Sequence, residues 1–125
     1  MSKGHILVVD DDPNVLTLAE EELQGAGYKV ETVLGGTDAL ELLGEEPCDI
    51  VFTDLMLAGT DGISLCRAIK KRFPKVHVVL MSAFPSEMEK YKREFCESGG
   101  FQEIIKKPFA AGKLLALTQK ILNAK

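Results

Sequence analysis

Five polar side chains follow short apolar segments of this chain, and their types suit phosphoryl transfer. Asp10 and Asp11 close one apolar run, and Asp54 closes another. Ser82 and Lys107 follow two later runs. Short apolar runs between helical patterns are typical of buried parallel strands, whose carboxyl ends share one edge of a sheet. We therefore expect the three carboxylates, the hydroxyl and the ammonium to converge on one pocket.

The three carboxylates suit Mg²⁺, a hard ion that takes one or two protein carboxylates and keeps several waters. Adjacent residues at a strand end point to opposite sides, so Asp10 and Asp11 have different roles. Asp11 and Asp54 are candidates for direct ligands, with Asp10 acting through a water and a backbone carbonyl after Asp54 filling another position. Without a cation the carboxylates repel one another, which raises at least one pKa.

Five strand-like runs alternate with five helix-like patterns, with no linker, repeat or low-complexity stretch. Right-handed crossovers between them predict an α/β fold: a doubly wound five-stranded parallel sheet, (βα)5 and flavodoxin-like, in strand order 2-1-3-4-5. The expected strands are 5–10, 28–32, 50–53, 76–81 and 101–105. The expected helices begin near residues 12, 37, 61, 86 and 109, and the last ends near residue 123.

Several residues outside the pocket are expected to be structural. Asp12 is an N-cap candidate, followed by Pro13 at the first helical position. The acidic run 20–22 is expected to face water, away from the apolar stripe of its helix. His5 and His77 lie at strand positions with no metal partner nearby in the sequence. We interpret both histidines as packing or edge residues.

The composition is that of one globular domain, which we expect to span residues 1–125. With 125 residues, 46% of them hydrophobic and 27% charged, the chain is long enough to bury a core. The net charge of -4 argues against direct nucleic-acid binding. No signal peptide or membrane-spanning run is recognised, and the three cysteines are odd in number and form no Cys-x-x-Cys pair. We expect a cytoplasmic protein with no membrane association and incidental buried thiols.

Four segments of the chain resemble the signature segments of response-regulator receiver domains, which share the fold of chemotaxis regulators. They occur in the family's order along the whole chain: 6–14 (ILVVDDDPN), 54–62 (DLMLAGTDG), 81–83 (MSA) and 107–109 (KPF). The resemblance implies that Asp54 is the phosphoacceptor, Asp11 the direct Mg²⁺ ligand and Asp10 its water-mediated partner. It also implies that the backbone carbonyl of Met56 completes the metal site.

The same resemblance assigns the groups that respond to the phosphoryl group. Ser82, followed by Ala83, would donate a hydrogen bond to a phosphoryl oxygen. Lys107 would pair with Asp54 and then with a phosphoryl oxygen. Pro108 would form the turn that directs Lys107 inward. These roles match the chemistry, because a carboxylate is a weak nucleophile and depends on positioning and on neutralisation of charge.

The resemblance implies a phosphorylation-dependent switch in two-component signalling. The phosphoryl donor would be a cognate sensor histidine kinase, a phosphotransfer protein or a small phosphodonor. The receiving partner would be a downstream target protein or an output domain outside this chain, and a phosphorylation-linked dimer is a further expectation. The chain would not be an enzyme beyond Mg²⁺-dependent self-phosphorylation and autodephosphorylation.

The chain departs from the family pattern in places that concern its output. Ile104 stands where the family usually has an aromatic residue, three positions before the lysine. Leu57 and Ala58 replace the common Met-Pro after the acceptor. We therefore expect coupling to rest on Ser82 and on backbone movement rather than on a rotating ring.

Two other classes share part of the pattern. Asp10-x-Asp12 resembles the strand-end motif of haloacid-dehalogenase phosphatases, but that family normally places Thr where this chain has Asn14. A flavodoxin-like flavin carrier would share the fold. The acidic first loop would repel a flavin phosphate, and no Ser/Thr/Gly-rich cradle follows the first strand.

Overall fold

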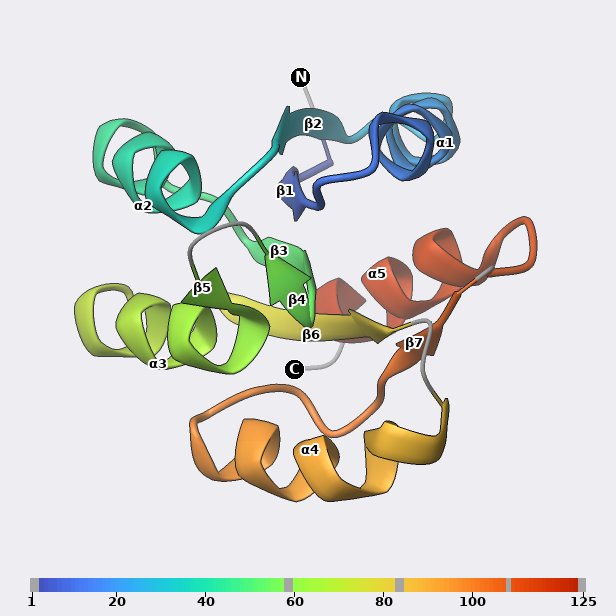
Figure 1. The fold of residues 1–125 in the computed structure, drawn as a ribbon. Helices are drawn as coiled ribbons and strands as arrows, with labels where there is room; N and C mark the ends of the chain where they lie inside the picture. The colour runs from blue at the N-terminus through green and yellow to red at the C-terminus, as the bar shows by residue number, and fades with distance from the viewer. Residues whose placement is uncertain (1–2, 58–59, 83–84, 108, 124–125) are drawn as a thin grey trace.

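Five parallel strands form one sheet in the order β2-β1-β3-β6-β7 (Figure 1). The computed structural model describes residues 3–57, 60–82, 85–107 and 109–123. The strands of the sheet are β1 (His5–Val9), β2 (Lys29–Val33), β3 (Ile50–Asp54), β6 (His77–Ser82) and β7 (Ile105–Lys106). Because β4 (Met56–Leu57) and β5 (Thr60–Asp61) pair only with each other, the predicted order 2-1-3-4-5 is confirmed.

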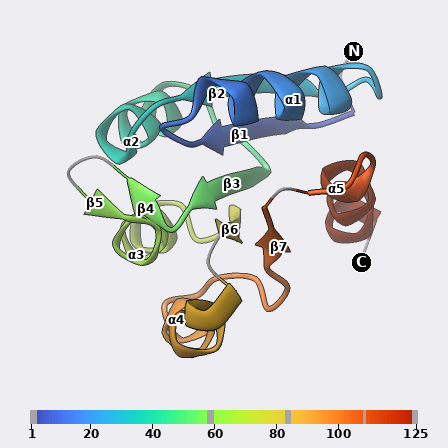
Figure 2. The ribbon, with the colours of Figure 1, turned by 45° about the vertical axis from the view of Figure 1, so that its right-hand side comes forward.

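Helices cover both faces of the sheet, as the doubly wound prediction requires. They are α1 (Pro13–Gln24), α2 (Gly36–Glu45), α3 (Gly62–Arg72), α4 (Pro85–Glu97) and α5 (Lys113–Asn123). Alternate residues of a strand point to opposite faces. Leu7 and Val9 accordingly pack with the helices α2, α3 and α4, whereas Ile6 and Val8 pack with α1 and α5. Figure 2 shows β1, β3, β6 and β7 following one another between these two layers.

The ends of α1 follow from local sequence. The Asp12 carboxylate accepts a hydrogen bond from the Asn14 backbone N–H at 3.0 Å, and Pro13 occupies the first turn, where its missing N–H leaves no bond unmade. The predicted N-cap is therefore confirmed. None of the helices in the described part of the chain is long and apolar enough to cross a membrane.

The fifth strand is shorter than predicted, because β7 covers two residues where the sequence suggested 101–105. The Phe101 N–H donates to the Val78 carbonyl, and the Lys107 N–H donates to the Ser82 carbonyl. Phe101 and Lys107 are six residues apart, whereas their partners Val78 and Ser82 on β6 are only four residues apart. The two surplus residues interrupt the ladder, which resumes only at Ile105.

The last helix begins at Lys113, four residues later than predicted. Gly112 precedes it with a φ of +87°, a left-handed conformation that favours glycine and that a helix starting at residue 109 would not contain. Its first turn is held by a distant residue: the Glu22 carboxylate of α1 accepts the backbone N–H of Gly112 at 2.7 Å and that of Leu115 at 2.9 Å. The prediction that Glu22 faces water was therefore wrong.

The buried cysteines behave as the incidental thiols that the sequence predicted. Cys48 and Cys66 are buried, and Cys96 is half-buried. Burial raises the pKa of the Cys48 thiol to about 12 and that of the Cys66 thiol to about 11. Both thiols therefore stay protonated, and unreactive as nucleophiles, at neutral pH.

The substitution Glu22→Ala tests the contact between α1 and α5. It removes an anion that caps the α5 N-terminus from outside the helix, so we expect the free energy of unfolding to fall by about 1–2 kcal/mol. Urea denaturation followed by circular dichroism measures the change. Glu21→Ala is the matched control, because Glu21 is the exposed neighbour on the same helix. Equal losses in the two variants would show that the cap contributes nothing.

Candidate functional site

The three carboxylates predicted to converge do meet at the carboxyl ends of β1 and β3. Asp10 and Asp11 follow β1, and Asp54 ends the neighbouring strand β3. One carboxylate oxygen from each lies within 4.8 Å of the others. Asp10 is fully buried, the Asp54 side chain is 15% exposed and Asp11 faces solvent. The site is thus an acidic cluster that opens toward water on the side of Asp11 and Asp54.

Lys107 follows β7, the outermost strand of the sheet, and its side chain contacts two of the three carboxylates. Its Nζ lies 2.5 Å from Asp10 Oδ2 and 3.2 Å from Asp54 Oδ1. The pairing with Asp54 was expected, but the shorter contact with Asp10 was not. The other Asp10 oxygen, Oδ1, accepts the Asp12 backbone N–H at 2.9 Å. Both oxygens of the buried Asp10 therefore have a donor from the protein.

Ser82 is the last residue of β6 and therefore lies at the carboxyl end of the sheet, as the three carboxylates do. Ser82 is 1% exposed and pairs in register with Lys106, and its carbonyl accepts the Lys107 N–H at 2.8 Å. A single backbone bond thus connects the hydroxyl residue to the lysine that contacts Asp54. The predicted residues Ala83 and Pro108 lie outside the described residues.

The segment after Asp54 turns sharply, and a glycine makes the turn possible. Asp54 Oδ1 accepts the Leu55 N–H at 2.9 Å, and the Leu55 carbonyl accepts the Gly62 N–H at 2.7 Å. A Cβ on Gly62 would lie 2.4 Å from the Asp54 carbonyl oxygen, closer than real atoms approach. Met56 pairs with Asp61 in the small β4–β5 ladder and its side chain is 59% exposed. This ladder pairs the residues that follow the acceptor with the residues that precede α3.

Burial and neighbouring charge perturb the site. Burial raises the pKa of Asp54, the negative charge of Asp10 raises it further, and the Lys107 ammonium opposes both effects. Burial lowers the pKa of Lys107, but its hydrogen bond to Asp10 and the charges of Asp10 and Asp54 outweigh that effect, so the pKa is raised. Lys107 therefore stays charged at neutral pH. One ammonium faces three carboxylates, and a divalent cation would complete the neutralisation.

The donor set fits Mg²⁺. The cluster offers carboxylate oxygens only, and an exposed Asp11 leaves room for the waters that this ion keeps. When bound, the ion would supply positive charge next to Asp54. The convergence of one carboxylate oxygen from each of three aspartates within 4.8 Å is the observation that supports this fit, since a cation relieves the repulsion among them.

Sequence reasoning found the residues of this cluster but missed two of its supports. It assigned Lys107 to Asp54 alone and assigned no role to Gly62. The Asp10 contact had no local signal, because Asp10 and Lys107 lie 97 residues apart in the chain. Asp61 followed by Gly62 is typical of a tight turn. Sequence reasoning interpreted Asp61 only as the start of a helix and therefore missed this turn.

A family model described as the response regulator receiver domain matches residues 6–119. The chain belongs to this family. Receiver domains are signalling modules of two-component systems and are generally not enzymes. They bind Mg²⁺ in general and interact with histidine kinases and output domains.

Solved structures of receiver domains superimpose on nearly all of the chain. The BeF3-activated receiver domain of DrrB is 34% identical, with a TM-score of 0.86 over 99% of this chain and 100% of that one. NtrX from Brucella abortus is 29% identical, with a TM-score of 0.88 over 98% of this chain and 27% of that one. The chemotaxis response regulator CheY4 of Vibrio cholerae is 24% identical, with a TM-score of 0.84 over 97% and 98% of the two chains, and shows the shared fold alone.

The raised pKa of Asp54 predicts a pH-dependent stability. Because the folded protein binds this proton more tightly than the unfolded chain does, stability falls as pH rises from 3.8, the ordinary value, through the folded pKa. Asp54→Asn removes this penalty and should raise the melting temperature at pH 7 without metal. The gain should shrink as the pH falls through the folded pKa of Asp54 and should be gone below about 4.

Thermal melts at several pH values, in a metal-free buffer, measure this difference. Glu41→Gln, at an exposed position of α2, is the control and should leave the melting temperature unchanged. A metal-free Asp54→Asn variant that is less stable than the wild type at pH 7 would mean that the contact of Asp54 with Lys107 outweighs the burial and repulsion of its charge.

Proposed function

We propose that this receiver domain is a switch that accepts a phosphoryl group on Asp54. The observation that carries the proposal is the position of Asp54, a partly exposed carboxylate 3.2 Å from a lysine and grouped with two further carboxylates. The phosphoryl donor is a sensor histidine kinase, a phosphotransfer protein or a small phosphodonor. The domain spans residues 1–125, and we place it in the cytoplasm.

The contacts of Asp54 suggest which of its oxygens reacts. Oδ1 receives the Leu55 N–H and lies next to the Lys107 Nζ. Oδ2 is therefore the oxygen left to attack phosphorus. As the Oδ2–P bond forms, the bond from phosphorus to the donor breaks, and the donor keeps the electron pair. Lys107 offsets negative charge on the transferring group, and Mg²⁺, when bound, supplies the rest of the neutralisation.

We assign the Mg²⁺ ligands from the exposure and the contacts of each group. Asp11 is exposed and free to turn toward the ion, and Asp54 and the Met56 backbone carbonyl bind beside it. Asp10 acts through a water, because the Asp12 N–H and Lys107 already hold its two oxygens. This division agrees with the one or two carboxylates that Mg²⁺ usually takes from a protein.

The response to phosphorylation is proposed to run through Ser82 and Lys107. The Ser82 hydroxyl, adjacent to Ala83, donates to a phosphoryl oxygen, and Lys107 moves its contact from Asp54 to the phosphoryl group. Pro108 forms the turn that keeps Lys107 directed inward. Ile104, half-buried against the core cluster of α2, α3 and α4, replaces the usual aromatic residue, and backbone movement takes over its part in the coupling.

The output of the switch is a change of partner. The partner is a downstream target protein or an output domain, and phosphorylation-linked dimerisation is one form that the change can take. The chain spans about a quarter of the NtrX chain that it resembles, so receiver domains of this kind also occur within longer proteins. We propose no direct nucleic-acid or membrane binding by this domain and no enzymatic activity beyond its own phosphorylation and dephosphorylation.

Acceptor assignment is tested by phosphorylation with acetyl phosphate and Mg²⁺. The wild type should gain one phosphoryl group that alkali removes, and Asp54→Asn should gain none. Asp11→Asn should react about tenfold more slowly or worse, because it loses a direct metal ligand. Intact-mass spectrometry measures the labelling. Asp38→Asn, at an exposed position of α2, should label as the wild type does. Labelling of Asp54→Asn at the normal rate would disprove the assignment.

The variants Ser82→Ala and Ile104→Val test which of the two residues couples phosphorylation to the conformational response. We expect Ser82→Ala to abolish most of the phosphorylation-linked chemical-shift changes in β7 and α4, because it removes the donor to the phosphoryl group. Ile104→Val should cost about 1 kcal/mol of stability and little of the response. Backbone NMR spectra at equal phosphorylation make the comparison. Comparable losses in both variants would return a switching role to residue 104.

A further inference from the structure

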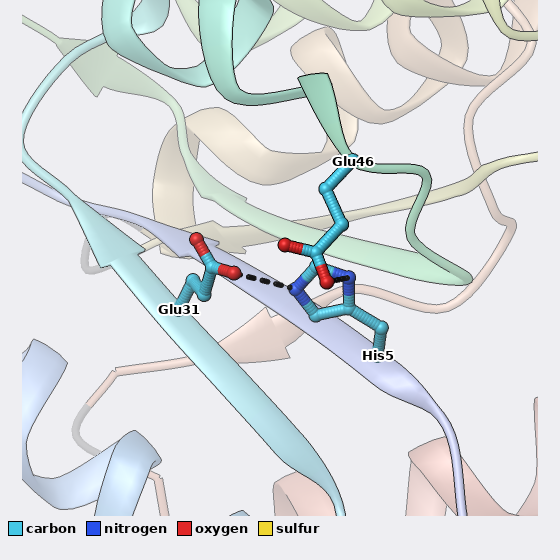
Figure 3. Close-up of side chains that lie close together, drawn as sticks. All are labelled: His5, Glu31 and Glu46. Carbon is cyan, nitrogen blue, oxygen red and sulfur yellow. Dashed lines mark ion pairs between the residues drawn. The ribbon is translucent and has the colours of Figure 1, made fainter. Parts of the chain in front are cut away.

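A second group of ionisable side chains lies at the opposite edge of the sheet from Asp54. His5 begins β1, Glu31 lies on β2, and Glu46 follows the last turn of α2 (Figure 3). One ligand atom from each lies within 4.8 Å of the others. Asp10 lies five residue steps along the extended chain from His5, a distance of roughly 16 Å. This group is therefore independent of the phosphorylation site.

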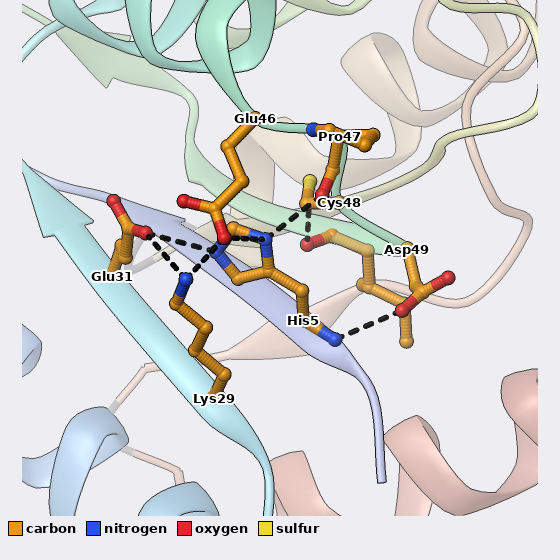
Figure 4. Close-up of polar contacts among 8 residues, drawn as sticks. His5, Lys29, Glu31, Glu46, Pro47, Cys48 and Asp49 are labelled. Atoms are coloured by element: carbon orange, nitrogen blue, oxygen red, sulfur yellow. Dashed lines mark hydrogen bonds and ion pairs between the residues drawn. The ribbon is translucent and has the colours of Figure 1, made fainter. Parts of the chain in front are cut away.

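The protonation of the His5 ring follows from its backbone contact. Nδ1 lies 2.9 Å from the Pro47 carbonyl oxygen (Figure 4). A carbonyl oxygen only accepts hydrogen bonds, so Nδ1 carries the hydrogen and donates it. In the neutral ring Nε2 then holds the lone pair. A backbone carbonyl behind the distal ring nitrogen is the arrangement that orients metal-binding histidines.

Nε2 points into the cluster without a hydrogen bond. His5 is 9% exposed, and its Nε2 makes no hydrogen bond to any described residue, although Glu31 Oε1 lies 3.2 Å away. A buried lone pair next to a carboxylate oxygen is unfavourable unless a proton or a metal ion lies between them. Two ligand atoms of a tetrahedral zinc ion, with bonds of about 2 Å, lie about 3.3 Å apart. The separation of Nε2 from Glu31 Oε1 matches that spacing, whereas Glu46 Oε1 lies 4.0 Å from Nδ1 and would turn toward Nε2 to complete the site.

The Lys29 ammonium lies near both glutamate side chains and offsets part of their negative charge. Its Nζ pairs with Glu46 Oε1 and lies 3.8 Å from Glu31 Oε1. The hydrogen bond between Lys29 and Glu46 raises the lysine pKa and lowers the glutamate pKa, so both carry charge at neutral pH. The Lys29 side chain is 47% exposed and is long enough to swing into water. An entering cation would thus displace a mobile ammonium and find an ionised ligand already in place.

We propose that His5 Nε2, Glu31 and Glu46 form a binding site for a divalent transition-metal ion of the zinc class. The imidazole nitrogen selects this class, because Mg²⁺ and Ca²⁺ prefer ligand sets made of oxygen alone. Three protein ligands leave a fourth position for water. The proposal goes beyond the interpretation of His5 as a packing or edge residue, because Glu31 and Glu46 lie far from it in the sequence.

The bound ion would join three elements that the sheet ladder, the core and the contacts of Lys29 and of His5 Nδ1 now connect. It would tie the start of β1 to the edge strand β2 and to the end of α2. A ligand that binds the folded chain alone raises the melting temperature by mass action. At a zinc concentration well above the dissociation constant, we expect an increase of about 5–10 °C.

Calorimetric titration of the metal-free protein with zinc chloride tests the site. Millimolar Mg²⁺ in the buffer occupies the carboxylates at the opposite edge. The wild type should bind one zinc ion. His5→Gln should lose this binding, and Glu31→Gln should weaken it about tenfold or more. His77→Gln is the matched control, because it removes the exposed second histidine, and it should bind as the wild type does.

A lysine variant keeps the test decisive even where His5→Gln fails to fold. Lys29→Gln removes the competing ammonium and should tighten zinc binding about fivefold, an effect opposite to that of Glu46→Gln. The ¹⁵N resonance of His5 Nε2 should shift when zinc binds. Absence of zinc binding, wild-type affinity in a folded His5→Gln, or equal effects of the Lys29 and Glu46 variants would overturn the proposal and leave an ion pair between His5 and Glu31.

Discussion

The contact of the Lys107 ammonium with two buried or half-buried carboxylates is the interaction on which the rest of the site depends. Asp10 is fully buried, and a buried carboxylate without a cationic partner is strongly destabilising. Lys107 supplies that partner and reaches Asp54 at the same time. The ion pair therefore joins the last strand of the sheet to the ends of β1 and β3. Residues from three separate parts of the chain form one charged centre because of it.

The same lysine explains how chemistry at Asp54 can reach a distant surface. Its backbone N–H is bonded to the Ser82 carbonyl, so in the proposed switch a shift of Lys107 would reach the end of β6. The ladder between β6 and β7 is short and interrupted, and few bonds oppose a small displacement there. A ligand or modification changes a conformation only through a difference in contact energy between two states. In the proposed switch, the modified carboxylate, its lysine and the short strand would provide such a difference without an aromatic residue at position 104.

The two edges of the sheet carry different kinds of polar chemistry. At the carboxyl edge an acidic cluster of oxygen ligands faces solvent, which suits a hard cation and a reactive carboxylate. At the amino edge a buried imidazole joins two glutamates, which suits a softer ion and a structural role. Between them lie the buried apolar residues of β1 and β3, which separate the two clusters. Stability at one edge can therefore change without altering the reacting group at the other.

By itself the sequence determined the element order, the parallel sheet and the convergence of Asp10, Asp11, Asp54, Ser82 and Lys107. These features follow from local signals, namely apolar runs, an Asp-Pro helix start and polar residues at strand ends. The tertiary structure alone decided the closer pairing of Lys107 with Asp10, the cap that Glu22 places on α5, and the grouping of His5 with Glu31 and Glu46. Each of these contacts joins residues that are distant in the chain. The two extra residues that interrupt the ladder between β6 and β7 likewise follow from the register of the two strands. Local signals bring strand-end residues to one edge of the sheet, but packing decides which individual side chains pair there and elsewhere.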